Sequence, residues 1–450
     1  MPIFDSSALN VGVRKREVFG WAMYDFANSG YTTVVLTAVF NAYFVGVVAA
    51  NASWATLAWT SALALSSAVV MLTMPSLGAL ADLRAAKKHM LMLSTAGCVL
   101  ATAALALAGP GDLWWAIAAI VVSNVFYSFG ESLTAAFLPE LARRNALGRV
   151  SGWGWSFGYF GGMLTLGLSL GYVLWAQRQG LTAQQFVPVT MLITAGIYGA
   201  ASLVTFALLK ERARPQAAAA QDNGVRASLA RLAQTWRQAQ DHRDFVWLLL
   251  CAVAYQAGIA VVIALAAVYA EQVLGFVQTQ TMLLIFLVNI ASAVGAFVFG
   301  YWQDRLGHRK ALALTLLGWI VMTRLAAAAT DAALFWVAAV VAGLCMGSSQ
   351  SAGRALAGAF APAQRLAEFF GLWTFAVRLA AILGPMTYGL VTLLTAGNHR
   401  IAILSTGLFF VVGLILLMRV NVPRGIAAAE SASTAITGAI TARGDDGGRA

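Results

Sequence analysis

The stretch Gly300-Tyr301-Trp302-Gln303-Asp304-Arg305-Leu306-Gly307-His308-Arg309-Lys310 is a short charged segment between two long apolar ones. A related stretch, Gly78-Ala79-Leu80-Ala81-Asp82-Leu83-Arg84-Ala85-Ala86-Lys87-Lys88, occurs in the first half of the chain. Each begins with glycine, carries an aspartate four residues later and ends in two basic residues. The two aspartates are 222 residues apart in a chain of 450. A motif that returns after half the length predicts two similar halves, which is typical of transporter folds.

Composition places the chain in a membrane. Hydrophobic residues make up 60% and charged residues 10% of the sequence, with a mean hydropathy of +0.76, whereas soluble domains carry about 25% charged residues. About 20 apolar residues span a bilayer as a helix, which satisfies its own backbone polar groups. We therefore predict an all-α polytopic membrane protein with twelve spans near residues 18–48, 55–80, 89–108, 113–137, 151–176, 185–209, 245–270, 280–302, 310–330, 333–353, 367–395 and 400–420.

The basic residues that give the net charge of +11 lie mostly on one side of the membrane. With these spans, 24 lysines and arginines fall on one side, while only Arg178 and Arg400 fall in the opposite loops. Basic residues concentrate in cytoplasmic loops, so both termini are predicted to be cytoplasmic, and an even number of spans agrees because it places both termini on one side. The basic balance therefore indicates topology, and it predicts no nucleic-acid partner.

The spans form two predicted six-helix bundles, residues 18–209 and 245–422, after a short cytoplasmic N-terminus, residues 1–17. The polar residues 210–244 link the bundles and end in a basic amphipathic segment, which is predicted to lie on the membrane surface. Residues 423–450 are rich in Ala, Ser, Thr and Gly. They are predicted to form a disordered cytoplasmic tail.

Two carboxylates fall inside spans of the first half. Asp25 lies on a polar face of the first span, and Glu131 lies on a polar face of the fourth. A carboxylate in a membrane is costly unless it meets a partner or a water-filled cavity, so both are candidate proton carriers. A structural bond to a neighbouring helix is the alternative for each. Neighbouring side chains on these two faces that are candidates for a substrate cavity are Tyr24, Asn28, Tyr31 and Tyr127.

The second half offers cations in its spans. Arg378 lies about a dozen mostly apolar residues beyond the preceding basic loop, and Arg354 follows the tenth span. A buried arginine needs an anion, either a protein carboxylate or a substrate, and the sequence leaves both open. Carboxylates in one half and cations in the other suit a zwitterion. The candidate cavity residues of this half are Tyr255, Gln256, Asn289, Gln350, Arg354, Trp373 and Arg378.

The two charged turns resemble the loop motif of the major facilitator superfamily, which occurs between helices two and three and between helices eight and nine. The first copy departs from it at Leu83, where the family favours Arg, and at Ala85-Ala86. More narrowly, Trp21–Ser29, Phe137–Ala142, Gly152–Trp155 with Gly158–Gly162, and Glu368–Leu372 look like the vacuole-effluxer-like branch of that superfamily. Its fungal members are associated with amino-acid export.

The resemblance implies two six-helix bundles around a central cavity lined by helices one, four, seven and ten. It also implies that the two turns lock and release an inner gate through helix ends and neighbouring basic residues. The residues of the turns that would form this gating motif are Gly78, Asp82, Arg84, Lys87, Lys88, Gly300, Asp304, Arg305, Gly307, Arg309 and Lys310.

These features predict a secondary active transporter in the plasma (bacterial inner) membrane. Its substrate is expected to be a small solute, such as an amino acid or another zwitterionic or carboxylate compound, coupled to protons or Na⁺. An exporter of amphipathic drugs or lipid-like compounds is the alternative, favoured by the aromatic residues of the spans. A receptor is a further class, which flux in sealed vesicles would distinguish. The superfamily resemblance implies a monomer.

An enzyme is not predicted. The histidines His89, His242, His308 and His399 lie at loops or helix ends with no spacing that gathers them, and the three cysteines fall inside spans. No Gly-x-x-x-x-Gly-Lys-Ser/Thr loop is present to bind ATP. No metal or cofactor is therefore expected.

Overall fold

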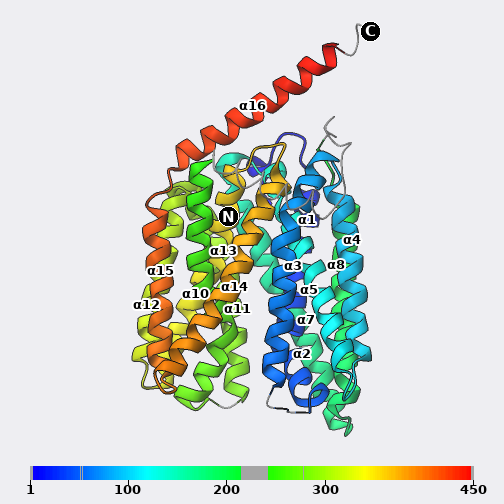
Figure 1. Cartoon of the computed structure of the whole chain (residues 1–450), viewed down its shortest axis with the longest axis vertical. Coiled ribbons are helices and arrows are strands. Elements are labelled where there is room, and N and C mark those ends of the chain that lie inside the picture. Colours follow the sequence, from blue (N-terminus) through cyan, green and yellow to red (C-terminus); the bar gives the residue numbers. More distant parts are fainter. Residues whose placement is uncertain (1–3, 51, 53, 214–241, 277, 447–450) are drawn as a thin grey trace.

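The computed structural model describes residues 4–50, 52, 54–213, 242–276 and 278–446. Within these residues, twelve helices are long and apolar enough to cross a membrane. They stand side by side in an upright bundle with two groups, one blue to cyan and one green to orange (Figure 1). The predicted all-α fold with twelve spans is therefore confirmed.

The first group, called the N-half, contains the first six spans. Its first span begins as α1 (Lys15–Tyr31) and continues through the wider turns η2 (Thr32–Ala38) and η3 (Phe44–Val48), with α2 (Phe40–Tyr43) between them. The other helices are α3 (Ala55–Leu83), α4 (Lys87–Ala104), α5 (Leu113–Ala135), the short α6 (Leu138–Leu141), α7 (Leu147–Arg178) and α8 (Ala183–Leu208).

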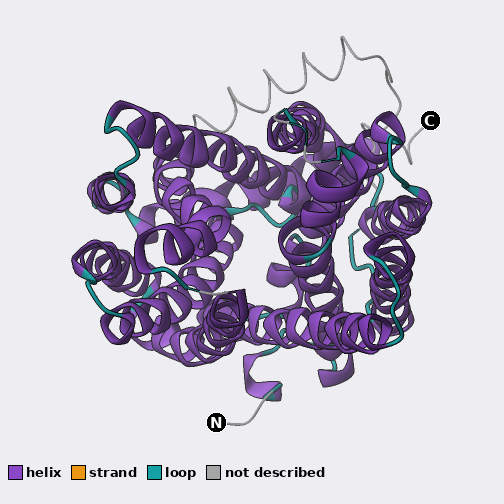
Figure 2. Cartoon of the chain, turned by 90° about the horizontal axis from the view of Figure 1, so that it is seen from below, coloured by secondary structure: helices purple, strands orange, loops and turns teal. Residues whose placement is uncertain are grey.

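The second group, called the C-half, contains the other six spans, and the view along the helices shows the two groups next to each other (Figure 2). Its helices are α10 (Arg243–Leu274), α11 (Gln278–Leu306), α12 (His308–Ala328), α13 (Ala332–Phe360), α14 (Leu366–Leu394) and α15 (His399–Leu417). Both charged turns, α3–α4 and α11–α12, lie at one end of the bundle with the α5–α7 and α13–α14 connections. We call this end the basic end.

The halves meet where α3 packs on α14 and where α7 packs on α11. Glycine makes both contacts possible. A Cβ on Gly78 would lie 2.2 Å from the carbonyl oxygen of Ala367, and one on Gly152 would lie 2.4 Å from that of Ala296. Because backbones approach this closely only without side chains between them, the first glycine of the Asp82 turn is a packing residue of the interface. Gly300, the first of the other turn, approaches Gly148 in the same way.

The C-terminal segment, which was predicted to be a disordered tail, is helical where the structure describes it. Residues Val422–Asp446 form helix α16, which leaves the bundle at an angle above the basic end (Figure 1). Its start is fixed because Arg424 donates two hydrogen bonds to Asp244, at 2.7 and 2.8 Å, and because Ala429 is fully buried. The Ala-rich composition that suggested disorder also has the highest helix propensity.

The linker between the halves is described only at its ends. Arg212 forms an ion pair of 2.5 Å with the buried carboxylate of Glu17 on α1, so the chain after α8 is held against the N-half. The predicted amphipathic segment lies largely within residues 214–241, outside the described residues.

Candidate functional site

An ion pair joins Asp25 of α1 to Arg354 of α13, across the boundary between the halves. The Arg354 Nη1 donates to the Asp25 Oδ2 at 2.7 Å, and both side chains are buried. The sequence named both residues but did not indicate that they meet. This contact ties the first helix of the N-half to the end of the tenth span.

The rest of the Arg354 guanidinium is held by the N-half as well. Its Nε donates to the Ser151 hydroxyl at 3.1 Å, and its Nη2 donates to the Ser151 carbonyl at 2.8 Å. The guanidinium carbon lies 4.8 Å from the ring centre of Trp21 and 5.2 Å from that of Trp155. Arg354 is therefore surrounded by a carboxylate, a hydroxyl, a carbonyl and two aromatic rings, all from α1 and α7.

A second ion pair, between Glu131 of α5 and Arg378 of α14, also crosses the boundary. The Arg378 Nη2 donates to the Glu131 Oε2 at 2.8 Å, and the guanidinium lies 5.8 Å from the Tyr127 ring centre. The Glu131 side chain is 37% exposed and that of Arg378 is 13% exposed. Among the described residues, the buried Arg378 Nε has no hydrogen-bond partner. The protein carboxylate that the sequence left open for Arg378 is thus Glu131.

Tyr24, which was predicted to line the cavity, packs within the N-half. Its fully buried hydroxyl lies 2.9 Å from the Thr95 hydroxyl and 3.3 Å from the Tyr198 hydroxyl, inside the N-half. The Tyr198 hydroxyl donates its proton to the Asn28 Oδ1 at 2.8 Å. Sequence reasoning missed Tyr198, although Thr190, Thr194, Tyr198 and Ser202 follow one another at four-residue steps on one buried face of α8.

Tyr31 and Tyr127 stack on each other with ring centres 4.9 Å apart. The Tyr31 hydroxyl lies 2.8 Å from that of Ser123, so the pair is anchored to α5. Since Tyr127 contacts both Arg378 and Tyr31, these two predicted residues connect the second ion pair to the interior of the N-half.

The remaining candidates of the C-half lie in two places. Gln256 of α10 donates to Gln350 of α13 at 2.8 Å, within the C-half. Tyr255 and Trp373 are buried against Gly353, where a Cβ would lie 2.2 Å from the Tyr255 hydroxyl. Asn289 donates to the Ile285 carbonyl of its own helix. Among the described residues, it forms no hydrogen bond to another candidate.

The Asp304 turn holds the start of α7. The Asp304 carboxylate accepts hydrogen bonds from the backbone amides of Gly148 at 2.9 Å and Arg149 at 3.2 Å. It also accepts one from the Arg149 Nε at 2.9 Å. A carboxylate at a helix start satisfies free amides and meets the positive end of the helix dipole. Arg149 was counted in the sequence only as a topological charge.

The Asp82 turn holds the start of α14 in the same manner. The buried Asp82 carboxylate accepts a hydrogen bond of 3.0 Å from the Glu368 amide, and the Ala367 amide also points at it. The Glu368 side chain bonds to Arg365 through two contacts of 2.6 Å. Each half therefore caps a helix of the other half with the aspartate of its turn.

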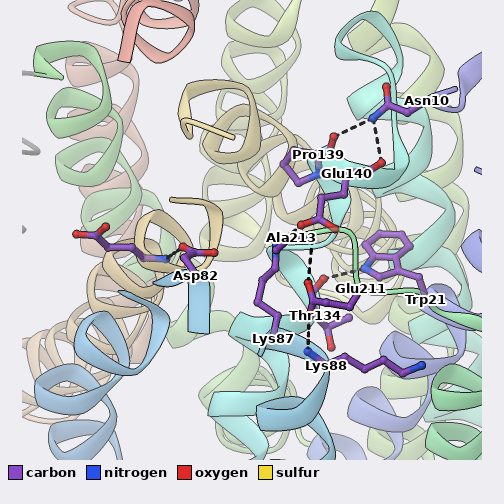
Figure 3. Close-up of polar contacts among 11 residues, drawn as sticks. Asn10, Trp21, Asp82, Lys87, Lys88, Thr134, Pro139, Glu140, Glu211 and Ala213 are labelled. Carbon is purple, nitrogen blue, oxygen red and sulfur yellow. Dashed lines mark hydrogen bonds and ion pairs between the residues drawn. The ribbon is translucent and has the colours of Figure 1, made fainter. Parts of the chain in front are cut away.

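The basic residues of the turns were predicted to hold the gate, and three of the six have other contacts. The buried Lys87 pairs with Glu140 (Figure 3), and Lys88 donates to the Leu209 carbonyl, both within the N-half. Arg309 donates to the Val420 carbonyl at 3.3 Å. Exposed side chains account for the rest of the predicted set: Arg84, Arg305 and Lys310. The part of these residues in a gate stays a prediction.

The fold defines the class of protein. It superposes on the human organic anion transporter MFSD10 (TETRAN) with a TM-score of 0.70 at 15% identity, covering 90% of this chain and 99% of that one. It also superposes on FucP in the outward conformation, a transporter of the major facilitator superfamily (MFS), with a TM-score of 0.66 at 14% identity, covering 90% and 98%. The fold is thus that of the MFS.

The sequence comparisons define the family. The profile of the family described as "Vacuole effluxer Atg22 like" matches residues 13–148 and 144–430. The uncharacterized MFS-type transporter YxiO of Bacillus subtilis (strain 168) is 26% identical over 405 residues, 88% of this chain and 93% of that protein. The chain belongs to the Atg22-like vacuole effluxer family. It is an integral membrane protein and an MFS transporter, not an enzyme.

Proposed function

We propose that the protein is a proton-coupled secondary active transporter that moves an amino acid or another zwitterionic or carboxylate solute across the plasma membrane. The basic end faces the cytoplasm, because basic residues concentrate on that side. The observation that carries the proposal is that Asp25 and Glu131 of the N-half each pair with an arginine of the C-half, at 2.7 and 2.8 Å.

The two pairs link proton binding to the motion of the halves. Alternating access moves one half against the other, so opening of the basic end must separate Asp25 from Arg354. Separating a buried ion pair costs about 3–5 kcal/mol when a charge is left without a partner. A proton on Asp25 or Glu131 removes one of the two charges and lowers this cost. Proton uptake therefore favours the opposite conformation, which is the requirement for coupling.

The charges of the pairs support the substrate class. A zwitterion carries an ammonium group and a carboxylate, which match the carboxylates of the N-half and the arginines of the C-half. The same fold carries a fucose:proton symporter and a proton:xylose symporter, so proton coupling is compatible with this architecture.

Proteoliposomes with an imposed proton gradient test the proposal. A panel of labelled amino acids, short peptides and amphipathic organic compounds is offered to the wild type, Asp25→Asn and Glu131→Gln. We expect gradient-driven accumulation of an amino acid or other carboxylate, and we expect at least one variant to lose accumulation while it keeps exchange at equilibrium. Transport that ignores both the gradient and the substitutions would exclude proton coupling, and accumulation of only the amphipathic compounds would favour drug or lipid export.

A further inference from the structure

The Arg354 guanidinium occupies a binding site that belongs wholly to the other half. Its charge faces the Asp25 carboxylate at 2.7 Å, two of its nitrogen donors reach the hydroxyl and the carbonyl of Ser151, and the rings of Trp21 and Trp155 lie close to it. Only α1 and α7 contribute to these walls. We call this set of four residues the α1–α7 receptor.

The N-half holds the walls of the receptor in place through its own contacts. The Trp21 Nε1 donates to the Thr134 carbonyl at 2.8 Å, and the Trp155 ring lies 5.9 Å from that of Tyr159 on the same helix. Helices α1 and α7 are themselves in close contact, since a Cβ on Gly161 would lie 2.2 Å from the Phe26 carbonyl oxygen. The receptor therefore keeps its shape when Arg354 leaves, because its positions are fixed by its own half.

Ser151 also bonds directly to the C-half. Its hydroxyl donates to the Ser351 carbonyl at 2.9 Å, while the same oxygen accepts from the Arg354 Nε. Separation of the halves removes both partners together and leaves the hydroxyl oxygen and the Ser151 carbonyl free to accept from a ligand. The hydroxyl and the carbonyl are thus available only in the state in which Arg354 is absent.

The chemistry of the receptor matches a guanidinium or primary ammonium group. A carboxylate and a carbonyl accept hydrogen bonds from such a cation, and indole faces attract it through the ring quadrupole. The Glu131–Arg378 pair differs, because it offers one aromatic ring and one hydrogen bond, and its carboxylate is 37% exposed. The α1–α7 receptor is the more complete cation site of the two.

We propose that the α1–α7 receptor binds the guanidinium or ammonium group of a ligand from the cytoplasm, and that Arg354 fills it while the basic end is closed. Access of the ligand to the wild type rests on the proposed alternating access, because only separation of the halves removes Arg354. The ligand and Arg354 then compete for one site. A cation that binds only the separated state shifts the population toward a cytoplasm-open transporter.

Removal of the competing arginine allows a direct test. Purified Arg354→Ala is titrated with methylguanidinium, and binding is measured by the rise in the thermal unfolding midpoint. Methylurea, the neutral analogue, serves as the control ligand. We expect methylguanidinium but not methylurea to stabilise Arg354→Ala. Addition of Asp25→Asn should weaken binding about tenfold or more, since it removes a charge-assisted hydrogen bond.

A second pair of variants tests the aromatic walls. In the Arg354→Ala background, Trp155→Ala should weaken methylguanidinium binding several-fold, whereas Trp175→Ala should leave it unchanged. Trp175 lies on the same helix but is exposed at its far end, so it controls for the loss of an indole. Equal binding by a folded Arg354→Ala with and without Asp25→Asn would overturn the receptor.

The wild-type architecture supplies a measurement that does not depend on the folding of Arg354→Ala. Ser156 donates to the Ala293 carbonyl at 2.9 Å across the interface, and Cys98, Cys251 and Cys345 are buried. Methylguanidinium on the cytoplasmic side should accelerate alkylation of Ser156→Cys several-fold, and unchanged alkylation would overturn the proposal. Methylguanidinium binding without any solute transport would refute the proposed function but not the receptor. Solute transport without methylguanidinium binding would refute the receptor alone.

Discussion

The Asp82 turn and the Asp304 turn perform one task with different chemistry. Each aspartate accepts hydrogen bonds from the second and third residues of a helix in the opposite half, Ala367 and Glu368 of α14 or Gly148 and Arg149 of α7. The two contacts differ in the side chain of the third residue of each helix. Arg149 adds a side-chain bond to Asp304, whereas Glu368 places a second carboxylate near Asp82 and turns it toward Arg365.

The comparison shows a different source of positive charge at each aspartate. Arg149 of the opposite half bonds to Asp304, whereas the positive charge that acts on Asp82 is that of Lys87 in its own turn. Arg305 follows Asp304 in the second turn, where Leu83 follows Asp82 in the first, yet the Arg305 side chain is exposed. The departure at Leu83 therefore removes no contact seen in the other copy. The cation that matters for Asp304 comes from α7, and α14 supplies none in the same position.

Neutralising each aspartate should show the largest difference between the Asp82 contact and the Asp304 contact. Asp304→Asn breaks a charged contact and leaves Arg149 without its partner, at a cost of about 2–3 kcal/mol to the closed basic end, whereas Asp82→Asn loses about 1 kcal/mol from bonds to amides. The rate of alkylation of Ser156→Cys from the basic end measures opening. We expect Asp304→Asn to accelerate it far more than Asp82→Asn, and equal rates would show that the two contacts are equivalent.

Substitution of the third helix residue should have opposite effects at the two contacts: at Arg149 it should favour opening of the basic end, and at Glu368 it should favour closure. Arg149→Gln removes a charge-assisted bond and favours opening by about 1–2 kcal/mol. Glu368→Gln removes a like charge beside Asp82 and releases Arg365 toward it, so it should favour closure by a few tenths of a kcal/mol, about the size of a partly exposed pair. The same alkylation assay gives the sign of each effect, and opening by Glu368→Gln would refute the account of the Asp82 side.

The turns also differ in their backbones. Gly307 has φ 86° and ψ 148°, which only glycine adopts easily, and Ala85, 222 residues earlier, has φ 50°. Gly307→Ala should lower the free energy of unfolding by about 1–2 kcal/mol, while Ala85→Gly should raise it by about 0.5 kcal/mol because it relieves left-handed strain.

Thermal unfolding in detergent measures both backbone effects. Gly167→Ala is the control, because this glycine is helical and no neighbouring atom lies within 4 Å of the position that a Cβ would take there. The substitution should therefore be neutral or stabilising, as alanine has the higher helix propensity. Destabilisation by Ala85→Gly as large as that by Gly307→Ala would show that the first turn is not strained.

Sequence patterns predicted the features that depend on local composition and repetition. The twelve spans followed from hydropathy, and the two turns followed from a spacing of 222 residues. Asp25, Glu131, Arg354 and Arg378 were identified because a charge in an apolar span requires a reason. These signals lie within single helices, so they could be recognised without knowledge of packing.

The contacts between helices could not be predicted in this way. Nothing in the sequence shows that Asp25 pairs with Arg354 rather than with Arg378. The choice depends on how α13 and α14 pack against the N-half. Arg149 lies among other basic residues of a loop, and its role appears only where α7 meets α11. Helix α16 was missed because composition does not show the Arg424–Asp244 contact that fixes its start.

Helix α16 connects the two halves at the basic end. It is bonded to the C-half through Asp244 and through Ser433, which accepts from the Ala363 amide, and its Glu430 reaches Arg144 of the N-half at 2.5 Å. Because both side chains of that last pair are about half exposed, it adds little free energy. The pair instead marks a distance that can be measured. Fluorophores attached at positions 430 and 144 would report, in single molecules, how far the two halves separate during transport.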